Sequence, residues 1–216
     1  MPSRRFLRMR HEVVGFAVGS LFFFVGSLPW YFDAVGVVAA NATFFVGSLF
    51  FTTAAVLQLL LDGRRAPITG TTAANALDWW SATVQLVGTA MFNVSTAVAL
   101  FAVVGDPDEV GAGWRSDAWG SLAFLVSSFL ALGALQRRHE LWDMFARTPG
   151  AVWLNVAGSV AFAASAVGAW VVPHTDEVLS AWWVSAGTMA GAACFFLAAV
   201  VSRPGVTQTG VSSPRD

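Results

Sequence analysis

Long apolar segments alternate with short polar ones along this chain. Six runs contain no charged residue, and they span 13–31, 35–61, 79–104, 119–136, 151–172 and 178–201. A helix needs about 20 residues to cross roughly 30 Å of hydrocarbon, so each run is near or above that length. Lipid offers no hydrogen bonds to backbone amides, and barrel strands would be about half as long with alternating polarity. The pattern predicts an all-α polytopic membrane protein with six transmembrane helices.

The composition agrees with this prediction. Hydrophobic residues make up 56% of the 216 residues and charged residues only 12%, which is more apolar surface than a soluble domain of this size can bury. The basic N-terminal segment followed by the first run could also indicate a cleavable signal peptide. We expect a membrane anchor instead, because the run is long and ends in Pro29-Trp30-Tyr31-Phe32 rather than a small-x-small cleavage site.

The basic residues are unevenly distributed. The sequence has no lysine, and in a six-span arrangement eleven of its twelve arginines fall on one side and Arg115 on the other. The positive-inside rule then places the N- and C-termini in the cytoplasm and the loops around Asp33, 106–117 and 174–177 outside. All ten tryptophans lie near the ends of runs, where indole rings prefer the headgroup layer. We therefore expect a multi-pass protein of the cell membrane.

A short signature, Gly-[Ser/Thr]-x-x-Phe, recurs in the first five runs, and the sixth keeps only a Gly-Thr pair. Gly19 and Gly88 are 69 residues apart, and Gly88 and Gly158 are 70 apart. Because two spans return the chain to the same side, this period predicts three parallel helical-hairpin repeats within one membrane domain, 1–216. The expected hairpins cover 10–64, 76–138 and 149–203.

The signature has the composition of a helix contact. In lipid the hydrophobic effect gives helices little net attraction, so small residues that permit close backbone approach and hydroxyls that bond across helices decide their association. Phenylalanine one turn later supplies bulk. The residues expected at helix contacts are Gly15, Gly19, Ser20, Gly26, Gly47, Ser48, Gly88, Thr89, Gly120, Ser121, Gly158, Ser159, Gly187, Thr188 and Gly191.

The segments between the hairpins differ in character. The Gly/Thr/Ala-rich stretch 62–78 is expected to be a flexible loop. In 137–149, Leu141, Trp142 and Phe145 share one helical face, which predicts a short helix in the cytoplasmic interface. The tail 204–216 has too few apolar residues to order itself, so we expect a disordered cytoplasmic tail.

The first hairpin resembles a known family. The run HEVVGFAVGSLFFFVGSLPWYF followed by FFVGSLFFTTAAVLQ is similar to the YrhK-like domain, a two-helix bacterial membrane module with Gly-Ser-Leu-Phe in both helices. The resemblance covers 10–61, about a quarter of the chain. The second and third hairpins resemble diverged copies. The resemblance implies a multi-pass membrane protein and provides no catalytic residues and no activity.

The polar residues within the runs are neutral. Asn41, Gln85, Asn93 and Asn155 could clamp helices together or form a polar patch for a small solute. The absence of charge at depth disfavours a proton relay, a voltage sensor and a Schiff-base chromophore.

The loop 106–117 has a partial resemblance to a calcium-binding loop. It has Val110 where an oxygen ligand is needed and Asp117 where a bidentate Glu is usual, so a solvated acidic loop is favoured. We expect no metal site, no catalytic residues and no cofactor. The arginines follow topology rather than forming a groove, so nucleic acid is not an expected partner either.

These observations favour a non-enzymatic helix-packing or partner-binding membrane protein. The alternative is a facilitator or channel for a small neutral solute through a central pathway between the hairpins. A membrane enzyme is disfavoured because no nucleophile and base occur at matching depth. Membrane lipids are the expected partners, with another membrane protein or a second copy of the chain left open.

Overall fold

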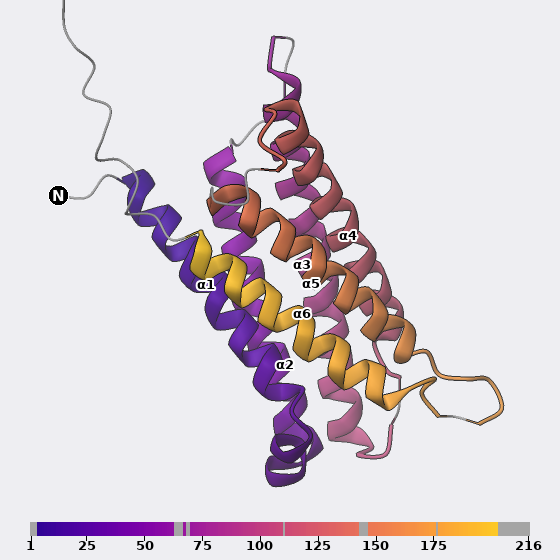
Figure 1. The fold of residues 1–216 in the computed structure, drawn as a ribbon. Coiled ribbons are helices and arrows are strands. Elements are labelled where there is room, and N and C mark those ends of the chain that lie inside the picture. Colours follow the sequence, from indigo (N-terminus) through magenta and orange to yellow (C-terminus); the bar gives the residue numbers. More distant parts are fainter. Residues whose placement is uncertain are drawn as a thin grey trace, which may run out of the picture.

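Six helices account for most of the chain in the computed structural model, which describes residues 4–62, 67, 70–109, 111–142, 147–175 and 177–202. All six are long and apolar enough to cross a membrane, which confirms the predicted all-α polytopic fold. In chain order they are α1 (Arg4–Gly26), α2 (Pro29–Asp62), α3 (Ala73–Gly105), α4 (Trp114–Arg137), α5 (Arg147–Gly168) and α6 (Ala181–Val201) (Figure 1).

The helices form a closed ring. Each helix packs on its neighbours in the chain, and α6 returns to pack on α1 (Figure 1). The closest packing is within the hairpins α1–α2, α3–α4 and α5–α6. We call the end of the bundle with the three hairpin turns the turn end, and the end where α1, α3 and α5 begin the linker end. Because successive helices are antiparallel, residues far apart in sequence share one level of the bundle.

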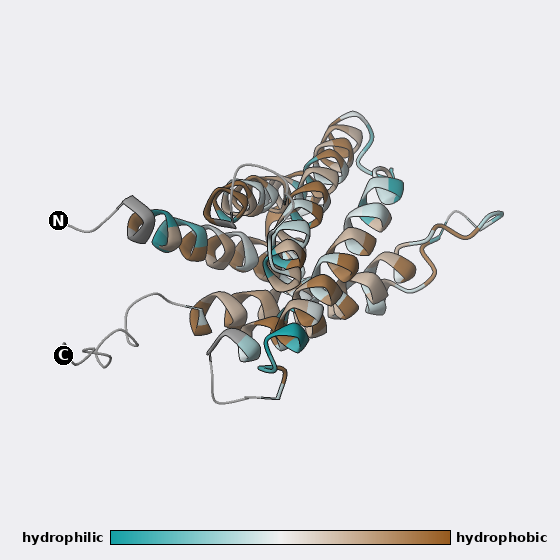
Figure 2. Ribbon diagram, turned by 90° about the horizontal axis from the view of Figure 1, so that it is seen from above, coloured by the Kyte–Doolittle hydropathy of each residue, from teal (hydrophilic) through white to brown (hydrophobic). Residues whose placement is uncertain are grey.

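The burial pattern is the reverse of that in a soluble protein. Ser20 and Ser48 are fully buried, whereas the leucines that follow them, Leu21 and Leu49, are 46% and 45% exposed. Large aliphatic side chains cover the outside of the helices, and small residues lie between them. Strongly hydrophilic residues lie mainly at helix ends and in loops (Figure 2). This distribution is expected where lipid surrounds the bundle, since hydrocarbon accepts apolar side chains and helix contacts require small ones.

The first hairpin turn is tighter than the sequence predicted. The first apolar run was expected to end at Tyr31, but α1 ends at Gly26 and α2 begins at Pro29. Proline is favoured at the first position of a helix because it has no N–H to leave unpaired and its φ is already helical. A break at Gly36, with φ 81° and ψ 165°, divides α2 and leaves Asp33 in its first short segment. The loop expected around Asp33 is therefore helical.

The linker end also differs from expectation. Of the predicted interfacial helix 137–149, residues 138–142 are in turns, 147–149 begin α5, and 143–146 lie outside the described residues. Leu141 and Trp142 lie against the start of α5 instead. The Trp153 indole N–H donates to the Leu141 carbonyl over 3.2 Å, and the rings of Trp142 and Trp153 are 5.9 Å apart. The predicted disordered tail lies beyond the described residues.

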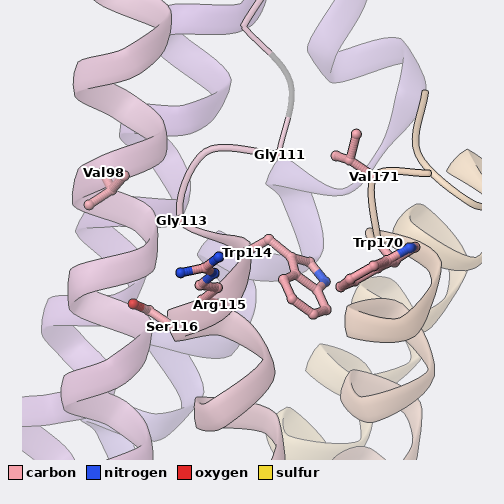
Figure 3. A pocket seen from close by; sticks show the side chains of 8 residues that line it. All are labelled: Val98, Gly111, Gly113, Trp114, Arg115, Ser116, Trp170 and Val171. Atoms are coloured by element: carbon pink, nitrogen blue, oxygen red, sulfur yellow. The ribbon is translucent and has the colours of Figure 1, made fainter. Parts of the chain in front are cut away.

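Two glycines determine the path of the α3–α4 loop at the turn end (Figure 3). Gly111 and Gly113 have φ of 80° and 81°, in the region that disfavours residues with a side chain. A Cβ atom on Gly111 would lie 2.4 Å from Val171 Cγ2, and one on Gly113 would lie 2.4 Å from the Ser95 carbonyl oxygen. The loop backbone is therefore wedged between α3 and the α5–α6 loop.

We expect Gly113→Ala to destabilise the protein, because the new methyl group would clash with the α3 backbone in an unfavourable φ. The cost is about 1–3 kcal/mol, measurable as a lower melting temperature in detergent. Gly105→Ala is the matched control, because Gly105 ends α3 with open space around it. Equal melting temperatures for the two variants would contradict the wedged loop.

Candidate functional site

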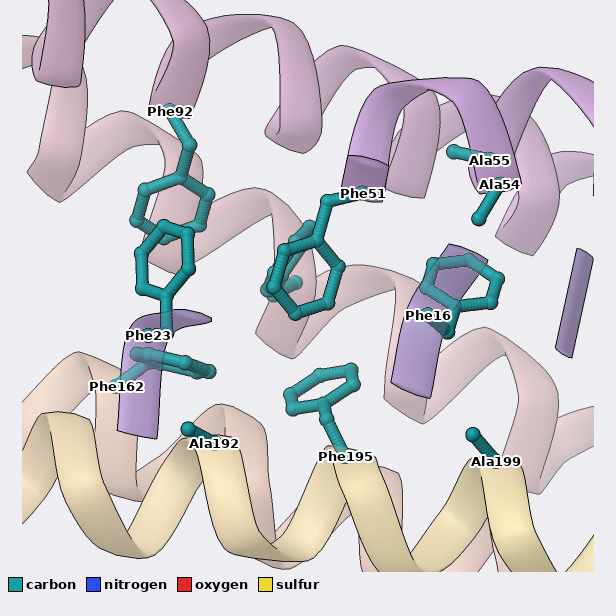
Figure 4. Packing of buried hydrophobic residues seen from close by; sticks show 11 residues of the cluster. Phe16, Phe23, Phe51, Ala54, Ala55, Phe92, Phe162, Ala192, Phe195 and Ala199 are labelled. Atoms are coloured by element: carbon teal, nitrogen blue, oxygen red, sulfur yellow. The ribbon is translucent and has the colours of Figure 1, made fainter. Parts of the chain in front are cut away.

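The phenylalanines of the signature meet on the central axis of the helix bundle. Phe23, Phe92 and Phe162, from α1, α3 and α5, form a triangle in which the ring centroids are 6.1, 6.1 and 5.9 Å apart (Figure 4). Each of the three is at most 5% exposed. Aromatic pairs at such separations stabilise a core beyond their buried area. The odd-numbered helices thus meet through one shared aromatic layer.

A second triangle lies beside the first. Phe51, Phe124 and Phe195, from α2, α4 and α6, have ring centroids 6.4, 6.1 and 5.4 Å apart. The two layers are joined within each hairpin, as in α5–α6, where Phe162 and Phe195 are 5.7 Å apart. The six rings fill the centre of the bundle at this level, so the signature faces the axis rather than the lipid.

The signature glycines receive these rings. In the first hairpin, a Cβ atom on Gly19 would lie 3.0 Å from the Phe51 ring, and one on Gly47 would lie 2.9 Å from the Phe23 ring. Each helix therefore gives a phenylalanine to its partner's glycine and receives one in return. The same exchange joins Gly88 with Phe124, Gly120 with Phe92, Gly158 with Phe195 and Gly191 with Phe162.

The sixth copy of the signature was missed in the sequence. It is Gly191-Ala192-x-x-Phe195, in which alanine replaces the hydroxyl residue. Ala192 is fully buried, like Ser20 and Ser48 at the corresponding positions. A pattern that allowed any small residue after the glycine would have found it.

Gly187 and Thr188, the Gly-Thr pair noted in the sixth run, lie one turn earlier and pack on α5. A Cβ atom on Gly187 would lie 2.7 Å from the Ala161 carbonyl oxygen, and the Thr188 hydroxyl is 2.8 Å from the Ser165 hydroxyl. The remaining predicted glycines, Gly15 and Gly26, face Ala54 and Phe44 of α2. All the glycines predicted at helix contacts therefore lie against a neighbouring helix.

Three signature hydroxyls join one hairpin to the next. The Ser48 hydroxyl on α2 is 3.0 Å from that of Thr96 on α3. At the α4–α5 contact, the Ser159 hydroxyl is 2.9 Å from that of Ser128 and 3.2 Å from the Phe124 carbonyl oxygen. Ser121 makes a longer bond, 3.4 Å, to the Phe162 carbonyl.

The other two signature hydroxyls bond within their own helices. Ser20 donates to the Phe16 carbonyl over 2.7 Å, and Thr89 donates to the Leu86 carbonyl over 2.9 Å. The α1–α6 contact, which closes the ring, thus has Ser20 turned to its own helix and Ala192 without a hydroxyl. Within the described part of the chain, no signature hydroxyl bonds across this contact.

The predicted intramembrane amides have different environments. Gln85 is buried, and its Oε1 lies 3.2 Å from the Ser127 hydroxyl of α4, as expected for a clamp. Asn41 donates to the Val37 carbonyl of its own helix over 2.9 Å. Asn155 is half-buried on α5. The Oδ1 atom of Asn93 is buried and, among the described residues, has no hydrogen-bond partner.

A cavity of about 420 Å³ opens at the turn end, and we call it the turn-end cavity (Figure 3). Its walls come from α3, the α3–α4 loop, the start of α4 and the segment after α5. The lining residues are Val98, Gly111, Gly113, Trp114, Arg115, Ser116, Trp170 and Val171.

The tryptophans hold this cavity in shape. The indole N–H of Trp114 donates to the Ala166 carbonyl of α5 over 2.8 Å, and its ring lies 4.5 Å from that of Trp170. Both tryptophans were expected at a membrane interface, but their contact could not be predicted because they are far apart in sequence. Within the described residues, no group of three His, Cys, Asp or Glu side chains could hold a metal ion.

Comparison with protein-family models gives no match to this chain, and no curated protein or solved structure matches it. The resemblance of the first hairpin to the YrhK-like domain stays a prediction from its sequence.

We expect Gly47→Ala to lower the melting temperature in detergent, because the new Cβ would lie 2.8 Å from Phe22 Cβ and 2.9 Å from the Phe23 ring. Overpacking of this kind costs about 1–3 kcal/mol. In the control Gly133→Ala, the nearest atom would be at an ordinary 3.4 Å, so little change is expected. An unchanged Gly47→Ala protein would show that this stripe can accept a methyl group.

Ser159→Ala should destabilise the protein more than Ser20→Ala. Both serines are fully buried, but Ser159 bonds across to α4 and Ser20 bonds within α1. Interhelical hydroxyl bonds in membranes contribute about 0.6–2 kcal/mol. Melting temperatures of the two variants in the same detergent test this difference, and a larger loss for Ser20→Ala would contradict it.

Proposed function

We propose that the protein is a non-enzymatic integral membrane protein of the cell membrane, whose signature stripes pack its helices and whose outer surface is available to a partner. Six apolar helices are consistent with a multi-pass membrane protein. The arginine distribution favours cytoplasmic N- and C-termini, which would place the linker end in the cytoplasm. Membrane lipids are its general partners in this proposal, and another membrane protein or a second copy is a specific one.

The filled axis is the observation that carries this proposal. A solute pathway between three hairpins would run where the two phenylalanine triangles lie, and all six of those rings are at most 5% exposed. The glycines that accept the rings are used in the same contacts. The glycines and phenylalanines of the signature are thus all used in contacts between helices, which supports a role in helix packing.

The same contacts support three hairpin repeats about an axis along the membrane normal. One triangle takes its rings from α1, α3 and α5 and the other from α2, α4 and α6, as a threefold arrangement of hairpins requires. The repeat boundaries at 10–64, 76–138 and 149–203 and the YrhK-like relationship belong to this proposal.

Transport of a small neutral solute is the second candidate, and unpartnered polar atoms favour it. The buried Thr52 Oγ1 and Asn93 Oδ1 have no hydrogen-bond partner among the described residues. Thr52 lies one turn from Ser48, and Asn93 lies one turn from Thr96, on antiparallel helices that those two hydroxyls join. An unsatisfied polar group at membrane depth is costly, and a passing solute could satisfy it.

Flux measurements on the full-length protein separate the two candidates. In proteoliposomes exposed to a glycerol gradient, the packing proposal predicts volume recovery at the rate of protein-free liposomes. Stopped-flow light scattering records this rate, and a known glycerol channel serves as the positive control. Faster recovery that is abolished by Asn93→Leu would replace the packing proposal with the transport proposal.

A further inference from the structure

A cation, Arg115, lines the turn-end cavity. Arg138 pairs with Asp78 at the linker end, whereas the Arg115 guanidinium makes neither an ion pair nor a hydrogen bond with the described residues. Figure 3 shows Arg115 between α3 and the Trp114 ring. Arginine has five N–H donors in a planar fork that matches the oxygens of a phosphate. An anionic oxygen group is the natural complement of this side chain.

The cavity lies at the depth of lipid headgroups. Trp170, just after α5, and Trp182 and Trp183, at the start of α6, lie at the turn end and are 42%, 67% and 50% exposed. Exposed tryptophans are enriched where headgroups meet hydrocarbon. Arg115 is in the first turn of α4, just before the apolar run that begins at residue 119. A phosphate held by Arg115 would thus be at its usual level in the bilayer.

The cavity wall continues into the apolar surface of α3. Val98 lines the cavity and is 44% exposed, and Phe101, on the same helix, is 72% exposed. A ligand that filled the cavity could extend along this surface as an acyl chain does. Free phosphate has no group for the apolar wall of Val98, Trp170 and Val171. The combination of an arginine and an apolar wall therefore favours a phospholipid.

The charges near the cavity favour a zwitterionic headgroup. Asp106, Asp108 and Glu109 are exposed just before Gly111. These carboxylates would repel a lipid with net negative charge and attract an ammonium group. A headgroup with its phosphate beside Arg115 and its amine toward the loop carboxylates would pair with the positive arginine and with the negative carboxylates.

We propose that the turn-end cavity is a binding site for one zwitterionic, amine-bearing phospholipid, with its phosphate on Arg115 and its amine toward the acidic loop. The volume of about 420 Å³ is within the roughly 300–1,000 Å³ of small-molecule sites. The contacts of Trp114 with Ala166 and Trp170 preform the site, so binding does not need to order its wall.

Native mass spectrometry of the delipidated full-length protein tests this site. Phosphatidylethanolamine and phosphatidylglycerol with identical acyl chains are added at matched concentrations, and the dissociation constant of the first bound lipid is measured. We expect tighter binding of phosphatidylethanolamine. Arg115→Gln should weaken it about tenfold to a hundredfold, the effect of losing a charge-assisted hydrogen bond. Arg137→Gln is the control, because it removes an exposed arginine from the opposite end of the same helix.

A second variant covers the case in which Arg115→Gln does not fold. Val98→Trp keeps an apolar residue on the surface of α3 but fills the cavity, so it should also weaken binding. Unchanged affinity in Arg115→Gln, or in Val98→Trp if only that variant folds, would overturn the proposal. Tighter binding of phosphatidylglycerol would overturn the zwitterionic assignment. Displacement of the lipid by inorganic phosphate at equal concentration would overturn the phospholipid assignment and indicate a simple anion site.

Discussion

The close approach of two backbones at a glycine is the contact on which the rest of this structure depends. Within a hairpin, each signature glycine lies under a phenylalanine of the partner helix, and a Cβ atom there would be 2.7–3.3 Å from the ring. Dispersion between closely packed atoms must hold such helices together, because lipid removes most of the hydrophobic gain from association. A phenylalanine can reach the axis because the facing residue has no side chain, so the aromatic layers follow from the glycines.

The hydroxyl groups of the signature act at a second level, between hairpins, and they do so unequally. Ser159 and Ser121 bond from one hairpin to the next at α4–α5, and Ser48 does so at α2–α3. At α1–α6 the corresponding position is Ala192. Since a hydroxyl bond across helices contributes about 0.6–2 kcal/mol, the closing contact of the ring relies more on apolar packing than the other two. The ring of six helices thus has the same aromatic contacts in every hairpin but different hydroxyl contacts between hairpins.

The sequence predicted the features that depend on local composition. Apolar run length predicted the six helices, and the signature glycines found in the sequence lie against neighbouring helices. It did not predict Phe195 as the sixth ring, because a hydroxyl was required where Ala192 stands. The turn-end cavity could not be predicted either, since Trp114 and Trp170 meet only after α4 and α5 have packed, and no spacing rule links them. The early end of α1 was missed because apolarity continues through Pro29, whereas backbone geometry ends the helix.

The division between core and turn end limits where selective recognition can occur. Six rings fill the axis, and the outer faces of the helices are mostly Leu, Val and Phe side chains that do not distinguish one acyl chain from another. Discrimination requires polar groups in a fixed geometry, because leaving such groups unpaired with the wrong ligand is costly. At the turn end, Gly111 and Gly113 bring a loop with an arginine at its end against two packed tryptophans. The same property of glycine, the absence of a side chain, therefore seals the centre of this protein and builds a cavity at its end.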